Sequence, residues 1–222
     1  MYIISFIAMI LSMGILMLCD IMSLGVWTVL FKCLASLFFI ITAILAYKKG
    51  SVAKSYFICM LAAFLFCFGG DTALAFGSDG LPFLLGVGSF SLGHLAFAAA
   101  YINQTKLKKM DLLRFAIIFI PCLILILSGP FDYQGMKPLV ILYLIIISTM
   151  VSKSLAMYQF HKQNSSFVTM TILGSFLFLV SDLILLFLFF LPDATPRLQE
   201  VNWLLYYVGQ GILAMSLAQY HD

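Results

Sequence analysis

Two aspartates lie inside stretches of sequence that otherwise consist mainly of apolar residues. Asp71 belongs to the segment FLFCFGGDTALAF at 64–76, and Asp182 belongs to GSFLFLVSDLILLFLFF at 174–190. A carboxylate at that depth in a bilayer costs about 3 kcal/mol on insertion scales, so an acidic residue there indicates a functional site. Two neighbouring carboxyls in a low dielectric cannot both ionise easily, and one then remains a proton donor while the other is an anion. The pair therefore predicts either acid–base chemistry or proton transport.

Five further polar side chains are expected at, or slightly below, the level of the aspartates. They are Lys32, His94, Tyr143, Tyr207 and Gln210. Lys32 is interpreted either as a helix-end anchor or as the partner of a carboxylate or phosphate. His94 is either a hydrogen-bonded core residue or a ligand-binding one. The tyrosines and the glutamine can equally bridge neighbouring helices through hydrogen bonds. No cofactor is predicted.

Transmembrane helices are the elements that must position these residues. Hydrophobic residues make up 64% of the chain and charged residues 9%, with a mean hydropathy of +1.12, whereas soluble domains are about 25% charged. A bilayer span needs about 20 mostly apolar residues. Eight such runs are found, at roughly 3–19, 26–47, 55–76, 81–102, 112–128, 137–158, 167–191 and 200–219. The sequence predicts an all-α, polytopic membrane helical bundle with eight transmembrane helices, forming a single domain over 1–222.

The distribution of charge predicts how this bundle is oriented. Basic residues gather around the connections after the second, fourth and sixth spans: Lys48, Lys49, Lys54, Lys106, Lys108, Lys109, Arg114, Lys153 and Lys162. The opposite connections are mainly acidic: Asp20, Asp79, Asp132, Asp193 and Glu200. Because Lys and Arg accumulate in cytoplasmic loops, both termini are expected to be cytoplasmic. The net charge of +3 reflects this topology, and the basic residues form no single face that would bind nucleic acid.

The motif FLF, followed after a short gap by Asp, occurs in both the third and the seventh spans. Each of these spans is the third helix of a four-helix half, and halves with an even number of spans share one orientation. Each aspartate lies about 16 residues, or roughly 24 Å, along its helix from the cytoplasmic side. The two carboxyls are therefore expected at one height, face to face in one lipid-accessible chamber and sharing a proton.

The cysteines give no sign of a metal site or of a disulfide framework. All five lie within or at the ends of apolar spans, without CxxC spacing: Cys19, Cys33, Cys59, Cys67 and Cys122. Free cysteines of this kind are small core residues.

Several short motifs, taken in order, resemble a known family. They are FKCLASL with Lys32, FGGD with Asp71, LGHLAFAAAY with His94, the helix of Tyr143, FLFLVSD with Asp182, and YYVGQGILAMSL with Tyr207 and Gln210. Their order and spacing are similar to those of the YhhN-type lysoplasmalogenase family of eight-span membrane proteins. The likeness covers the second to the eighth span. The family usually has Lys-Pro where this chain has Lys32-Cys33.

The resemblance implies hydrolysis of the vinyl ether bond of lysoplasmalogens with ethanolamine or choline head groups. The products would be a fatty aldehyde and a glycerophospho-base. Asp182 is then the expected acid, and Asp71 the expected anion that stabilises an oxocarbenium-like cation and activates water, as carboxylates do in glycosidases. Lys32 and the Tyr or Gln side chains would hold the phosphate or glycerol hydroxyls. The partners implied are a lysophospholipid substrate and membrane lipids.

Two other functions remain open at this point. One is a proton-coupled transporter in which the same aspartates carry protons. The other is a metal-dependent intramembrane lipid hydrolase with His94, Asp71 and Asp182 as zinc ligands, although the only other histidines lie in cytoplasmic segments. A purely structural protein would have no reason to keep two acids in hydrocarbon. Short loops and the lack of an outer domain fit the inner membrane of a bacterium.

Overall fold

Eight α-helices account for most of residues 1–221, which are the residues that this computed structural model describes. The helices are α1 (Tyr2–Ile21), α2 (Val26–Tyr47), α3 (Lys54–Phe76), α4 (Gly80–Gln104), α5 (Lys109–Ser128), α6 (Lys137–Phe160), α7 (Ser165–Phe190) and α8 (Leu198–Ser216). No strand occurs in the described residues. The predicted runs match these helices to within about three residues at each end, and Pro121 is accommodated inside α5 without ending it.

Seven of the helices are long and apolar enough to cross a membrane, which identifies the chain as an integral membrane protein. The exception is α8, whose sequence includes Glu200, Asn202 and Gln210. Asn202 and Gln210 point into the protein and are almost fully buried. The hydropathy of α8 is therefore lowered by residues that face other helices, not lipid.

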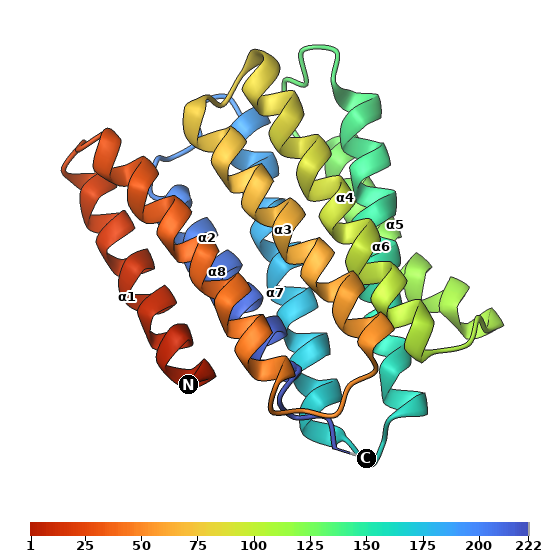
Figure 1. Cartoon of the computed structure of the whole chain (residues 1–222). Helices are drawn as coiled ribbons and strands as arrows, with labels where there is room; N and C mark the ends of the chain where they lie inside the picture. Colours follow the sequence, from red (N-terminus) through yellow and green to blue (C-terminus); the bar gives the residue numbers. More distant parts are fainter. Residues whose placement is uncertain (222) are drawn as a thin grey trace.

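Six helices form a closed ring in which α2, α3, α4, α6, α7 and α8 contact one another in that order and α8 returns to α2. Outside this ring, α1 packs on α2 and α8, and α5 packs on α6 (Figure 1). Both chain ends lie at the same end of the bundle, beside the α2–α3 and α6–α7 connections (Figure 1). Two of the three predicted basic connections thus lie at the end that carries the termini.

Lys153, one of the basic residues assigned to that end, is buried inside a helix and not in a connection. Lys153 lies within α6, is only 3% exposed, and places its Nζ 3.0 Å from Oδ2 of Asp111 on α5. Arg114 forms a second ion pair with the same carboxylate at 2.6 Å. A buried lysine needs such a partner, so Lys153 ties α5 to α6 and does not act as a loop charge.

Aromatic side chains pack against one another in the middle of this six-helix ring. Phe178 of α7 lies at their middle and contacts Phe90, His94 and Phe97 of α4 as well as Tyr206 of α8. Edge-on and tilted contacts of this kind add to the stabilisation from burial. The packed rings position α4, α7 and α8 relative to one another.

The α7–α8 contact depends on glycines. A Cβ added to Gly174 would lie 2.6 Å from Cγ of Leu213 and 2.9 Å from the carbonyl oxygen of Gly209. Gly69 and Gly70, just before Asp71, play a comparable part on α3, where Ser89 and Phe90 of α4 occupy the space beside them. Small residues therefore let these helix backbones approach closely.

Gly174→Ala should destabilise the protein by about 1–3 kcal/mol, because the new methyl group meets backbone that cannot move aside. The change should appear as a lower midpoint of thermal unfolding in detergent. Gly14→Ala on α1 is the matched control, since a Cβ there meets nothing within 4 Å. Equal midpoints for the two variants would show that the α7–α8 contact is not tight.

Candidate active site

A polar cavity lies inside the bundle between α1, α2, α3, α7 and α8. It has an empty volume of about 810 Å³, and we call it the central cavity. Its lining residues with polar side-chain groups are Asp20, Thr28, Lys32, Asp71, Ser78, Ser181, Asp182, Gln199, Asn202, Trp203 and Tyr206. Several of these come from the ends of α1, α3 and α8 that are opposite the chain termini. Both intramembrane aspartates therefore line a single cavity that extends toward one end of the bundle.

Hydroxyl groups hold Asp71 in this cavity. Its Oδ2 accepts hydrogen bonds from Ser36 Oγ at 2.7 Å and from the Tyr206 hydroxyl at 2.7 Å. The Tyr207 hydroxyl lies 3.2 Å from Ser36 Oγ and 3.2 Å from the carbonyl oxygen of Lys32. Each hydroxyl donates only one hydrogen. When Ser36 donates to Asp71, Tyr207 can therefore donate in turn to Ser36.

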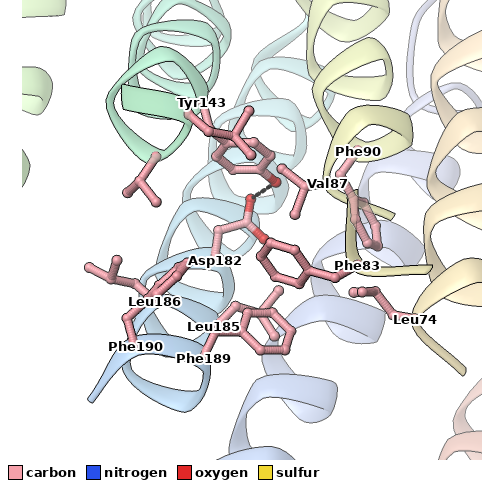
Figure 2. A pocket seen from close by; sticks show the side chains of 12 residues that line it. Leu74, Phe83, Val87, Phe90, Tyr143, Asp182, Leu185, Leu186, Phe189 and Phe190 are labelled. Atoms are coloured by element: carbon pink, nitrogen blue, oxygen red, sulfur yellow. Dashed lines mark hydrogen bonds between the residues drawn. The ribbon is translucent and has the colours of Figure 1, made fainter. Parts of the chain in front are cut away.

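Asp182 is held by a phenol and an imidazole. Its Oδ2 lies 2.7 Å from the Tyr143 hydroxyl and 2.9 Å from Nε2 of His94, and those two groups are 2.8 Å apart (Figure 2 draws the Tyr143 bond). The other imidazole nitrogen, Nδ1, is buried without a partner in the described residues. A buried acceptor without a partner is tolerated better than a buried N–H. This assigns the hydrogen to Nε2, from which His94 donates to Asp182.

The second oxygen of each aspartate is free. Neither Asp71 Oδ1 nor Asp182 Oδ1 takes part in a hydrogen bond within residues 1–221. Neither of these two oxygens is completely enclosed by the protein. The two carboxyls do not hydrogen-bond to each other in this part of the chain. Each Oδ1 is therefore available to a ligand in the cavity, and each can carry a proton while its Oδ2 still accepts two hydrogen bonds.

The two aspartates have equivalent places in the two halves of the chain. Asp71 on α3 is held from α2 of its own half and from α8 of the other half. Asp182 on α7 is held from α6 of its own half and from α4 of the other. The order of the helices around the ring repeats in the same way: α2, α3 and α4 of the first half are followed by α6, α7 and α8 of the second half. This arrangement agrees with the repeat suggested by the FLF motifs.

Apolar space borders Asp182 on two further sides. One space, the apolar pocket, has an empty volume of about 530 Å³ between α4, α6 and α7, and Phe83, Val87, Phe189 and Phe190 line it around the aspartate (Figure 2). A smaller groove of about 310 Å³ lies between α5, α6 and α7 and also reaches Asp182. The carboxyl of Asp182 thus lies where polar and apolar spaces meet.

Lys32 provides the positive charge in the central cavity. It lines the cavity one helical turn, or about 6 Å, from Ser36. Its ammonium takes part in none of the hydrogen bonds or ion pairs found in residues 1–221. The carboxylates whose charge acts on it are those of Asp71 and Asp20. An ammonium in a cavity without a direct protein partner is suited to bind an anionic group of a ligand.

Some predicted residues lie behind the cavity wall. Tyr207 and Gln210 are fully buried and do not line the central cavity, and both polar side-chain atoms of Gln210 lack a partner in the described structure. His94 is also fully buried and reaches the site through Asp182 and Tyr143. These three residues are thus placed to support or orient the lining, while Tyr143 lines the apolar pocket directly.

Ser36 and Tyr206 were not predicted, although both bind Asp71. Ser36 lies four residues after Lys32, so it occupies the same helix face, and this spacing was the available signal. Asn202, which donates to the carbonyl oxygen of Ser181 at 2.8 Å, was also missed. It is one helical turn from Tyr206, again on one face.

The arrangement of potential metal ligands was also considered. No group of three or more His, Cys, Asp or Glu side chains that could hold a metal ion occurs in the region covered by the structure. His94 and Asp182 meet, but Asp71 is held separately by hydroxyl groups. The geometry therefore gives no support to the three-ligand zinc site considered from the sequence.

Comparison with known proteins adds one finding. The model of the YhhN family matches residues 27–217, which span α2 to α8 and include both aspartates and all their hydrogen-bond partners. No curated protein and no solved structure matches the chain.

Proposed function

Because the chain belongs to the YhhN family, we propose that it hydrolyses the vinyl ether bond of lysoplasmalogens to a fatty aldehyde and a glycerophospho-base. One observation carries this proposal: two carboxyls, each with a free oxygen, line one cavity, and one of them also borders an apolar pocket. A vinyl ether lysolipid needs an acid and an anion at the junction between its polar and apolar parts. The resemblance found from the sequence supports the same reaction.

In the proposed complex, the substrate places its chain in apolar space and its head group in the central cavity. Its alkenyl chain occupies the apolar pocket beside Asp182, and its phosphate binds the ammonium of Lys32. Lys32 lies one turn above Ser36, which holds Asp71, and the glycerol backbone bridges this distance of about 6 Å. The vinyl ether then lies between the two carboxyls. Entry from the bilayer through the groove between α5, α6 and α7 brings the chain directly to Asp182.

Asp182 acts as the acid in the first step. A proton on Oδ1 is transferred to the alkene carbon remote from the ether oxygen, and the pair of electrons of the double bond forms the new C–H bond. The ether oxygen shares the resulting positive charge. Tyr143 and His94 donate to Oδ2, which stabilises the carboxylate that the transfer leaves behind. General acid catalysis of this kind contributes about 10²–10⁴-fold to a rate.

Asp71 acts as the anion and then as the base. Ser36 and Tyr206 donate hydrogen bonds to its carboxylate, whose negative charge stabilises the cation. Asp71 then takes a proton from the water that attacks the cationic carbon. In the collapse of the hemiacetal, Asp71 returns this proton to the glycerol oxygen, and the hemiacetal hydroxyl returns one to Asp182. Both carboxyls regain their starting states, and one water has been consumed.

We further propose that all eight helices cross the inner membrane of a bacterium, with both termini in the cytoplasm. The basic connections at the end with the termini support this orientation. The central cavity then extends toward the outer leaflet, from which a lysolipid can enter.

The test is to incubate the purified protein with alkenyl, alkyl and acyl lysolipids that share one head group. Aldehyde should be released from the alkenyl lipid alone, because only a vinyl ether can be protonated to a stabilised cation. Release of fatty acid from the acyl lipid would instead indicate an esterase. If no lipid is cleaved while the protein carries protons across liposome membranes, the transporter alternative replaces this proposal.

A further inference from the structure

Asn202 of α8 lines the central cavity, yet the proposed reaction gives it no part. Only 4% of the residue is exposed. Its amide nitrogen, Nδ2, donates to the carbonyl oxygen of Ser181 at 2.8 Å and lies 2.9 Å from Ser181 Oγ. A carbonyl oxygen accepts hydrogen bonds but cannot donate one, so it must face the NH₂ group of the amide. This contact fixes which way the amide of Asn202 is turned.

The oxygen of the same amide, Oδ1, is the group that this contact leaves free. It takes part in no hydrogen bond within residues 1–221, and the protein does not completely enclose it. Because Asn202 is otherwise buried and lines the central cavity, the accessible part of its side chain faces that cavity. A side chain that is held by its donor and turns an unused acceptor toward a cavity is suited to bind a hydrogen-bond donor there.

Asn202 lies close to both aspartates. Ser181, which holds its amide, is the residue next to Asp182 on α7. Tyr206, which donates to Asp71 at 2.7 Å, lies four residues after Asn202 on the same face of α8. One turn of helix is about 6 Å, which two O–H···O hydrogen bonds of about 2.8 Å in series nearly span. A single water can therefore bridge Asn202 Oδ1 and the free Oδ1 of Asp71.

We infer that Asn202 positions the water that attacks the cation. This assignment rests on the proposed function and adds a residue to its hydration step. The water donates one hydrogen to Asn202 Oδ1 and the other to Asp71 Oδ1, which leaves an oxygen lone pair to form the bond to the cationic carbon. As this C–O bond forms, an electron pair of the C=O⁺ group returns to the ether oxygen, and Asp71 takes the proton on its side. The amide exchanges no proton, and it acts by holding the nucleophile in place.

Methanol added to the reaction tests this step, because methanol can capture the cation in place of water. Capture by water leads to the aldehyde and the glycerophospho-base, whereas capture by methanol keeps the lipid intact as a mixed methyl acetal. Asn202→Ala removes the acceptor that holds the water and leaves room for the methyl group of methanol. With an alkenyl lysolipid, we expect the early ratio of acetal to aldehyde to rise about tenfold over the wild-type ratio, the effect of one lost hydrogen bond.

Asn103→Ala is the matched control. Asn103 is exposed in the last turn of α4 and lines neither the central cavity nor the two apolar spaces, so this variant should keep the wild-type ratio. Asn202→Ser is a second test variant. Its hydroxyl can still donate to the carbonyl oxygen of Ser181 and so preserve the contact between α7 and α8, but it is too short to hold the water, and the ratio should again rise.

The ratio depends only on the protein that folds and turns over, so a lower yield of one variant does not alter it. A variant of Asn202 that turns over with the wild-type ratio overturns the assignment, and so does a lack of acetal from every protein. Loss of both products in both variants would also overturn it, because positioning of water does not affect formation of the cation that methanol captures. An equal rise with Asn103→Ala would have the same meaning. If the wild-type protein releases no aldehyde without methanol, the proposed function itself is refuted, and the role of Asn202 with it.

Discussion

Asp182→Asn is expected to lower the rate of aldehyde release by about 10²–10⁴-fold, the contribution of a general acid. The amide has nearly the same shape as the carboxyl, and its oxygen can still accept the hydrogen bonds from Tyr143 and His94. What it lacks is an acidic proton at the position of the free Oδ1. The loss should therefore appear in kcat measured with an alkenyl lysolipid, with little change in thermal unfolding.

Reaction in D₂O gives a direct view of the same step. The wild-type protein should place one deuterium on the carbon next to the aldehyde carbonyl, because the acid delivers a solvent-derived proton there. The aldehyde must be reduced at once to prevent later exchange. Full turnover by Asp182→Asn, with the same labelling, would show that another group is the acid. Asp193→Asn serves as the control, since it changes an exposed loop carboxylate in the same way.

The second large effect is expected for Asp71→Asn, which should also reduce aldehyde release by about 10²–10⁴-fold. The hydroxyls of Ser36 and Tyr206 can still donate to the amide oxygen, so the local structure should persist. The substitution removes the negative charge that stabilises the cation and the group that accepts the proton of water. Because Lys32 remains in place to bind the phosphate, KM should change much less than kcat.

Combining the two substitutions separates a shared role from two independent ones. Residues that act in one mechanism show losses that do not add. The double variant Asp71→Asn with Asp182→Asn should therefore be about as slow as the slower single variant. Losses that multiply fully, or turnover retained by either single variant, would contradict the paired role of the two carboxyls.

The helices could be predicted from the sequence because each apolar run is close to the length of a bilayer span and polar residues mark its ends. Counting from helix ends also predicted that Lys32 approaches Asp71, and the structure has both residues lining one cavity. The rotation of each helix could not be obtained in this way. Tyr206 and Tyr207 are neighbours in sequence, and only the packing of α8 places Tyr206 against Asp71 and Tyr207 behind it.

The contact between His94 and Asp182 could not be predicted from the sequence for a related reason. Counting residues from the helix ends placed His94 deeper than the aspartate, yet Nε2 lies 2.9 Å from its carboxyl. Such counts treat all helices as upright and level, whereas tilt and unequal lengths shift them along one another. Hydrogen bonds between distant helices therefore required the three-dimensional structure, as did the two apolar spaces that meet at Asp182.

The exchange of partners between the two halves has a consequence for how this molecule can be built. Asp71, in the first four helices, accepts a hydrogen bond from Tyr206 in the last four. Asp182, in the last four helices, accepts one from His94 in the first four. A single four-helix half, even if it inserted and remained intact, would keep the donor of its own half, Ser36 or Tyr143, but would lack the second donor of its aspartate. Neither half alone can thus supply both hydrogen-bond donors to its aspartate. An early form of this architecture would have required two such units to pair as a dimer before they were fused into one polypeptide.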